Sequence, residues 1–598
     1  MKLAVNRKAI TWSGVVIVLV AVLAINGGAW LLERALMAPV NTYIRDRTLA
    51  FLQEKSVEGL TITFPRVDLS LIRRHLLIHD LSIRYDNKDS TRYVRFQATV
   101  PRIALEGVDL ADIIWHRHLR LDAVRLSSPL LSRFRETADT TRKKTPATDE
   151  ERVNPDSLAA EIPALDTVVY NLFASWLPDD VRQARIDLVA AENATIVFTS
   201  LKGSKISRDS TAGMSLRIRG IQLDTTERRV FESARLSAAS LFHLTTGLRD
   251  SLRIDSLLVQ LDPTDTTIEF RSLRTIPADS GHSLYLSRFK RDHREGRFTL
   301  DSISYQTLRP DSVFFGRGAT RKTRVRLMMK GLKASGVETG ALPAMKAVAR
   351  KVEIDSMVID ALADTRAESH PKSRRLWPQA LAETKWQVAI DTVVLKNGFV
   401  RYGELKPDRK EPAVAWFSNI SATITGLGNH PEKAVVAHPA IMVAQGKFMG
   451  HSLLETRMEV PIVPERFAMK VEGKATELPA VALNRFLLTA EGVEVTGGRF
   501  HRAEFGFHVA NGRAKGNITL VYDSLSVEMV DKATRKKGLS QQLKTFIANA
   551  LVIRGDNMPD DKGRLDPQPI DYRYRLGETF WGGIWRALRS GLVKTVKK

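Results

Sequence analysis

Cysteine is absent from the 598 residues of the chain. Without a thiol the protein has no disulfide, no thiolate nucleophile and no cysteine-ligated metal site. Common catalytic motifs are missing as well: the sequence has no G-x-S-x-G, no H-E-x-x-H, no P-loop and no G-x-G-x-x-G that opens a helix. We therefore expect a protein that is not an enzyme and that uses no cofactor.

Metal-ligating residues are also scarce. His116 and His118 stand two residues apart, which places both side chains on one face of a strand. No carboxylate partner is obvious beside them, so we expect no metal site.

Long apolar runs are rare, and residues 10–32 form the only one. A run of this length can cross a hydrocarbon core of about 30 Å as a helix. Trp12 and Trp30 lie near its two ends, where amphipathic rings favour the membrane interface. Basic residues precede the run, so we expect residues 1–9 in the cytoplasm and the body of the chain on the other side. The alternative is a cleaved signal peptide, but the run exceeds a usual signal-peptide core and no A-x-A site follows it.

Acidic residues are outnumbered: Lys and Arg total 90, Asp and Glu total 67, and the net charge is +23. On an intracellular chain this excess would suggest nucleic acid. Here the arginines are spread over predicted strands, and aromatic residues at RNA-binding spacing are absent, so we expect no nucleic-acid partner. An anionic lipid surface is the more natural partner, and a solvated basic face is the alternative for most individual residues.

The sequence does contain a strong alternation of apolar and polar residues, from Gly59 almost to the end. Period two is typical of strands with one apolar face. With about 12 residues per strand and turn, about 500 residues predict on the order of 35–40 strands. Open sheets rarely exceed about ten strands without curling or splitting. We expect a mainly β fold, in which the transmembrane helix precedes an elongated, curled β-sheet with a few short helices; several β-sandwiches are the alternative.

A loose repeat of the form apolar–Asp–Ser/Thr–apolar recurs in this region, as in Ile254–Leu257, Leu300–Ile303, Ile354–Met357 and Ile390–Val393. The gaps between copies are irregular, so the repeat does not predict a solenoid of fixed period. Each Asp is expected on the polar side of a strand. We interpret the repeat as a recurring strand and not as a series of metal ligands.

Breaks in the alternation divide the chain into segments. The expected segments after the anchor are residues 33–135 (a helix followed by strands), 136–157 (a mobile polar loop), 158–535 (a β body interrupted by helices at Leu158–Leu177 and Leu342–Val352), 536–577 (a helix and a polar loop) and 578–598 (a terminal helix).

The terminal segment has the pattern of an amphipathic helix. At about 100° per residue, Phe580, Trp581, Trp585 and Leu588 fall in one arc and most basic residues fall opposite. A basic helix with aromatic residues on its apolar face suits a membrane interface. A helix docked on the end of the protein's own sheet is equally compatible with the pattern.

Three stretches resemble a known family. Residues 67–86 (VDLSLIRRHLLIHDLSIRYD) and 93–131 resemble paired strands that open the AsmA-like superfamily, of the TamB and YhdP type. Residues 492–527 resemble its C-terminal segment. In that segment Gly497, Gly516 and Tyr522 stand at the matching places.

The resemblance implies a bridge-like lipid-transfer protein of the bacterial envelope. Such a protein is a single-pass protein of the inner membrane with its bulk in the periplasm. It carries phospholipid along a hydrophobic β-groove towards the outer membrane and has no family catalytic residues. The chain is shorter than the largest members, so an envelope protein partner or an oligomer is expected to complete the bridge. The alternative function is a periplasmic scaffold or chaperone for outer-membrane proteins, acting through exposed sheet edges.

A lipid groove and a membrane interface each predict a set of site residues. Apolar strand residues expected to contact acyl chains are Ile83, Tyr85, Phe96, Leu257, Val259, Phe270, Phe505 and Phe507. Residues expected at a membrane interface are Trp12, Trp30, Phe580, Trp581, Trp585 and Leu588.

Overall fold

The structure is a computed structural model, and it describes most of the chain between residues 39 and 597. Residues left out within that range are 40, 44, 47–58, 71, 89–91, 109–111, 113–115, 117, 138–182, 204, 224–230, 247–249, 263–265, 278–280, 317–322, 339–345, 367–374, 385–386, 408, 430–438, 464–466, 530–552 and 576–578. The predicted span 10–32, with Trp12 and Trp30, and the predicted helix Leu158–Leu177 therefore lie outside the described residues. No helix in the described part is long and apolar enough to cross a membrane.

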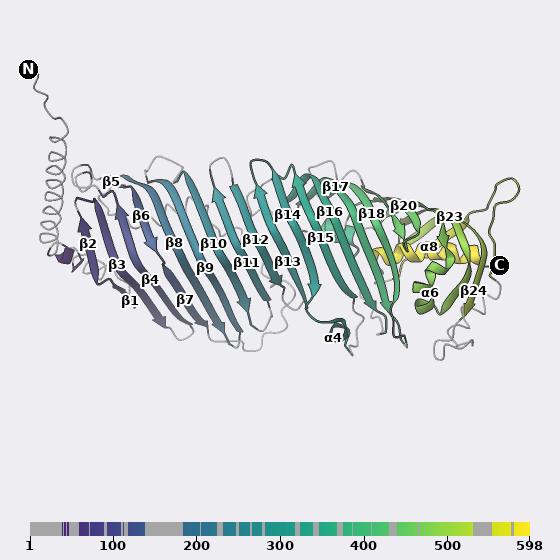
Figure 1. The fold of residues 1–598 in the computed structure, drawn as a ribbon, viewed down its shortest axis with the longest axis horizontal. Coiled ribbons are helices and arrows are strands. Elements are labelled where there is room, and N and C mark those ends of the chain that lie inside the picture. Colours follow the sequence, from purple (N-terminus) through teal and green to yellow (C-terminus); the bar gives the residue numbers. More distant parts are fainter. Residues whose placement is uncertain are drawn as a thin grey trace, which may run out of the picture. The chain divides into compact units, whose positions relative to one another are not determined.

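The described chain is mainly β and divides into two compact units, Met1–Ile268 and Glu269–Lys598. Figure 1 shows long strands side by side within each unit. Most pairs of strands are antiparallel, but a few are parallel, so the pairing is mixed.

The first unit is built from strands. They are β1 (Leu60–Thr63), β2 (Arg66–Ser70), β3 (His75–Lys88), β4 (Arg92–Glu106), β5 (His118–Leu121), β6 (Ala123–Ser127), β7 (Leu130–Thr137), β8 (Gln183–Lys202), β9 (Lys205–Leu223), β10 (Ser233–Thr245) and β11 (Asp250–Leu261). β5, β6 and β7 run parallel to β8. A parallel pair needs a connection of about a dozen residues or more, and residues 138–182 between β7 and β8 meet that need.

The second unit combines strands with short helices. Its strands are β12 (Thr266–Ile276, mostly in this unit), β13 (His282–Asp292), β14 (Arg297–Thr307), β15 (Thr323–Ser335), β16 (Lys346–Asp364), β17 (Gln387–Leu405), β18 (Ala413–Gly428), β19 (Ala440–Phe448), β20 (Ser452–Val460), β21 (Met469–Ala475), β22 (Leu478–Pro479), β23 (Val493–Ala510), β24 (Arg513–Met529) and β25 (Gln568–Arg573). Its helices are α4 (Asp311–Phe315), α5 (Trp377–Glu383), η4 (Ala480–Leu483), α6 (Asn484–Ala490) and α8 (Phe580–Val596).

The prediction of a helix at Leu342–Val352 is wrong from Lys346 onward. Those residues begin β16, which pairs with β15 on one side and runs parallel to β17 on the other. β17 pairs with this segment from Lys346 and β15 joins it from Lys351, and this tertiary pairing overrides a short helical spacing. The strands are also longer than the sequence spacing suggested, and β8 alone has 20 residues.

Many strands change the phase of their alternation near the middle, at a residue with positive φ. In β15, Met328 and Lys330 are exposed before Gly331 (φ 66), and the next exposed residue after it is Lys333. The spacing thus changes from two to three, yet the exposed side chains stay on one face. Similar positive-φ residues interrupt β3 at Asp80 and β11 at Ser256. An extra residue of this kind is the local signature of a β-bulge.

The Asp–Ser/Thr repeat coincides with this phase change. By register, Gly331 stands between Asp301 of β14 and Asp355 of β16. A Cβ on Gly331 would lie 2.1 Å from Asp355 Oδ2, so only glycine fits there. Asp301 forms an ion pair with Arg288 at 2.6 Å, and Asp355 forms one with Lys396 at 2.7 Å. These aspartates therefore lie on the polar side of their strands, where they have cross-strand partners.

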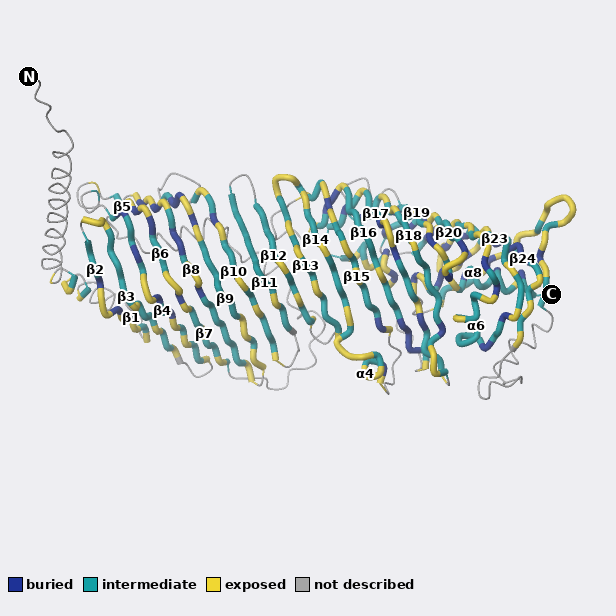
Figure 2. Tube along the Cα trace, viewed as in Figure 1, coloured by how far each residue is buried: buried dark blue, intermediate teal, exposed yellow. Residues whose placement is uncertain are grey.

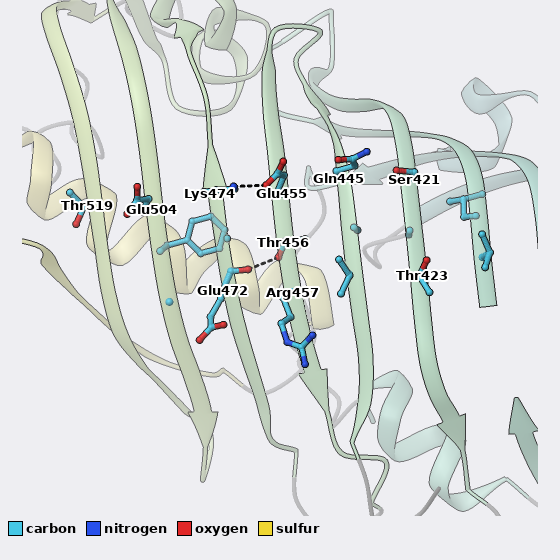
Figure 3. Close-up of a pocket in the computed structure, with 18 of the residues that line it drawn as sticks. Ser421, Thr423, Gln445, Glu455, Thr456, Arg457, Glu472, Lys474, Glu504 and Thr519 are labelled. Carbon is cyan, nitrogen blue, oxygen red and sulfur yellow. Dashed lines mark hydrogen bonds and ion pairs between the residues drawn. The ribbon is translucent and has the colours of Figure 1, made fainter. Parts of the chain in front are cut away.

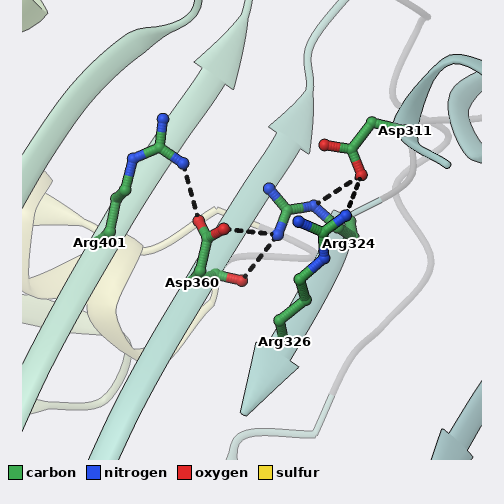
Figure 4. Close-up of polar contacts among 5 residues, drawn as sticks. All are labelled: Asp311, Arg324, Arg326, Asp360 and Arg401. Carbon is green, nitrogen blue, oxygen red and sulfur yellow. Dashed lines mark hydrogen bonds and ion pairs between the residues drawn. The ribbon is translucent and has the colours of Figure 1, made fainter. Parts of the chain in front are cut away.

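Helix α4 is attached to the sheet by a cluster of arginines and aspartates (Figure 4). Arg324 is only 1% exposed; its Nη1 lies 2.7 Å from Asp360 Oδ2 and its Nε 3.2 Å from Asp311 Oδ1. Arg326 also reaches Asp311, and Arg401 reaches Asp360. Burial raises the pKa of Asp360, but the hydrogen bonds and charges of Arg324 and Arg401 outweigh burial and leave that pKa below its usual value.

Candidate functional site

Three of the predicted groove residues lie together on one face of the first unit. Tyr85 of β3 is the register partner of Phe96 in β4, and Ile83 is the partner of Ala98. Directly paired residues project their side chains to the same face of a sheet. Ile83, Tyr85 and Phe96 are half-buried, so this apolar face is neither sealed in a core nor fully open.

The opposite face of the same strands is polar. Arg84 Nε lies 2.6 Å from Asp86 Oδ2, and Arg95 Nε lies 2.9 Å from Asp86 Oδ1. The hydrogen bonds from Arg95 and Arg84 lower the pKa of Asp86 to about 2. Arg133 of β7 is the register partner of Phe96 and lies on the apolar face as well, so that face is largely but not wholly apolar.

Leu257 and Val259 continue the apolar face in β11. They pair with Ala238 and Leu236 of β10, respectively, and both are half-buried. Figure 2 shows that intermediate burial dominates the strands of the first unit. The named elements between Leu60 and Leu261 are all strands, and helical residues are described there only at Asp112 and His116.

A buried cluster near one end of these strands is the main core of the first unit. It comprises Leu121, Ala184, Ile186, Val189, Ile218, Ile221 and Ala234. The groove residues are not among its members. Ala234 pairs with Leu261, which lies two residues from Val259, so the core lies on the same face as the groove residues and nearer the end of the strands.

Phe270 of β12 begins a run of aromatic rings in the second unit. Its ring stacks on Phe289 of β13 with centroids 4.6 Å apart, and Phe289 meets Phe298 of β14 edge-on at 5.2 Å. Phe289 and Phe298 are not among the predicted groove residues. The alternation changes phase at Arg288, so Phe289 follows Leu286 by three residues and does not fit a strict period of two.

An apolar row crosses the second unit from the aromatic run. In register order it consists of Phe289, Leu300, Leu332, Ile354, Leu395, Ala422, Ala444, Thr456, Gly473, Phe505 and Ile518. The side chains are large at first, become small between Ala422 and Gly473, and become large again at Phe505. The row ends under α8, where Gly591 approaches Ile518.

The remaining two predicted groove residues belong to a packed core. Phe507 is 3% exposed and lies in a cluster with Val471, Ile570 and, from α8, Ile584. Phe505 packs against the same cluster. The sequence pattern of β23 matches that of β11, but here α8 covers the apolar face.

Figure 1 shows α8 running across the strands of the second unit, and it contacts β24 and β25. Of the predicted interface residues, Phe580 is buried in the α8 cluster and Leu588 packs against it. Trp581 and Trp585 remain 59% and 44% exposed. The helix therefore docks on its own sheet and still presents two tryptophans to solvent.

A hollow of about 1220 Å³ lies across β17 to β24 (Figure 3). The hollow is lined by the middle of the apolar row and by the residues that neighbour this row on each strand, several of which are charged. Met458, Val471 and Phe507, the next residues on the α8 face, do not line it. The hollow therefore opens on the face away from α8. Its charged residues are Lys396, Arg457, Lys474, Glu455, Glu472 and Glu504.

These charges balance, and Lys474 Nζ lies 2.8 Å from Glu455 Oε2. The hollow thus offers no charge of one sign, and we assign it no ligand. His116 and His118 have rings 6.2 Å apart, and His116 pairs with Asp112 at 3.0 Å. Among the described residues, no group of three or more metal-ligating side chains occurs.

The fold and this face define a mainly β protein whose long strands carry a half-buried, largely apolar face. No protein-family model matches the chain, and no curated protein matches it.

Proposed function

We propose that the chain binds phospholipid and carries it along the apolar face of its strands. The observation that carries this proposal is the half-buried face that includes Tyr85, Phe96, Leu257 and Val259. A floor of this kind accommodates acyl chains and leaves polar headgroups at the rim, since burying apolar surface releases about 25 cal/mol per Å².

The remaining parts of the proposal come from the sequence. Residues 10–32 anchor the chain in a bacterial inner membrane, the bulk lies in the periplasm, and transfer runs towards the outer membrane. The resemblance to the AsmA-like superfamily supports this arrangement.

Site-specific photo-crosslinking in cells tests the proposal. A photoreactive phenylalanine replaces Phe96 or Val259 in the full chain, and mass spectrometry of the purified protein identifies the adducts. Matched controls carry the same residue at Gln97 or Arg253, which are exposed positions in the same two strands. Phospholipid adducts are expected at the first pair and not at the second. Equal labelling of both faces contradicts the proposal, and adducts with outer-membrane proteins alone would favour the scaffold function.

A further inference from the structure

Helix α8 is fixed to the sheet by a stripe of small residues. Gly583, Ala587, Gly591 and Thr595 recur every four residues, and all are buried. A Cβ on Gly591 would lie 2.4 Å from a methyl carbon of Ile518, so the helix backbone rests directly on the end of the apolar row. The Tyr522 hydroxyl also donates to the Thr595 carbonyl oxygen at 3.3 Å.

The other side of α8 carries the two exposed tryptophans. Trp581 and Trp585 are four residues apart, hence neighbours on one side of the helix. Phe486 of α6 meets Trp585 edge-on at 6.4 Å, which braces the ring without covering it. The two neighbouring rings together form an exposed apolar patch, which is the kind of surface found at interaction sites.

Basic residues outnumber acidic ones in and beside these two helices. α6 and α8 together contain Arg485, Arg586, Arg589 and Lys594, and neither helix contains an acidic residue. Arg589 does pair with Glu491 just after α6, at 3.3 Å. The balance still favours an anionic partner. Tryptophan prefers the headgroup region of a bilayer, and basic residues are attracted to anionic lipid.

We propose that α8 is a membrane-docking surface, which seats Trp581 and Trp585 in the headgroup region of a bilayer that contains anionic phospholipid. This inference rests on the proposed lipid-carrying function for its purpose, because a carrier must meet a bilayer at the end of its apolar row. A protein partner is the competing occupant, and the experiment below separates the two.

Vesicle flotation of the full chain provides the test. The chain is purified in peptidiscs, which cover any membrane-spanning segment, and mixed with vesicles of phosphatidylethanolamine and phosphatidylglycerol or of phosphatidylcholine alone. Binding to the anionic vesicles is expected. The double variant Trp581→Ser/Trp585→Ser is expected to bind at least about tenfold more weakly, equivalent to about 1.4 kcal/mol. The matched control is Val443→Ser, since Val443 is an exposed apolar residue of similar accessibility (49%) on the sheet.

Three results would overturn the inference: no flotation of the wild-type chain with anionic vesicles, equal flotation of the double variant, or an equal loss in the control. Loss of a co-purified protein from the double variant with unchanged flotation would assign the surface to a protein partner and also overturn it. Circular dichroism of the double variant confirms that it is folded. Crosslinking at Val259 distinguishes the two proposals, because phospholipid adducts persist if only docking fails.

Discussion

The ring of Phe505 lies across the backbone of Gly473, its register partner in β21. A Cβ on Gly473 would stand 2.4 Å from Phe505 Cζ and 2.9 Å from Cε2, so the site has room for the ring only because residue 473 has no side chain. An aromatic side chain packed over a cross-strand glycine stabilises a position that is otherwise weak in a sheet. This pair is where the apolar row passes from its stretch of small residues to the core under α8.

Gly473→Ala is expected to displace the ring of Phe505 and to lower the free energy of unfolding by about 1–3 kcal/mol, as overpacking does in well-filled sites. Gly506→Ala is the matched control, because a Cβ on Gly506 approaches only Glu472, at 3.8 Å. Urea denaturation of the two variants measures the difference. Equal midpoints for both variants would show that the ring moves aside at no cost.

Val259→Asp and Phe507→Asp are expected to differ, although both residues occupy apolar positions in alternating strands. Phe507 is in the packed cluster under α8. Replacing Phe by Ala in a core costs about 3–5 kcal/mol, and a charge at this position should destabilise the second unit by at least as much. Val259 is half-buried, so Val259→Asp should leave the chain folded and reduce bound phospholipid. Circular dichroism and mass spectrometry of extracted lipid measure the two effects. A folded, stable Phe507→Asp variant would contradict the core assignment.

Arg324→Ala is expected to destabilise the second unit by about 1.5–3 kcal/mol, the cost of losing hydrogen bonds to charged groups. Arg324 is 1% exposed and joins Asp311 to Asp360. Arg326→Ala removes a neighbouring arginine that also contacts Asp311 but is 43% exposed. It should cost at most about 1 kcal/mol. Thermal unfolding of the two variants compares these values, and the reverse order would show that α4 is not held by Arg324.

Asp86 predicts a pH dependence in the first unit. Its pKa is about 2 in the folded chain, held down by Arg95 and Arg84. In the unfolded chain an aspartate titrates at about 3.9. A carboxyl whose folded pKa is lowered stabilises the fold fully above its unfolded pKa, and this stabilisation is lost as pH falls through the folded pKa. Asp86→Asn should therefore be less stable than the wild type above about pH 4, and the gap should close towards about pH 2. Unfolding midpoints measured across this range provide the check. A gap that does not change with pH would contradict the assignment.

Local alternation of apolar and polar residues was sufficient to predict the mainly β fold and which side chains of a strand share a face. Tyr85 and Phe96 lie on one face and Arg84 and Asp86 on the other because side chains alternate across any strand. The helical pattern of residues 578–598 likewise corresponds to α8 at Phe580–Val596. The transmembrane span, the domain boundaries, the lipid and the cellular location stay predictions.

Sequence alone did not predict what lies over each apolar face. Val259 and Phe507 have the same local pattern, and only the docking of α8, a contact between segments distant in the chain, makes one a half-buried floor and the other core. The same contact divides the amphipathic arc of α8, so that Phe580 is buried while Trp581 is exposed. The sequence therefore determined which side chains share a face, because that is a property of neighbouring residues. The tertiary structure decided which of those faces are covered, because coverage depends on pairing and packing between remote segments.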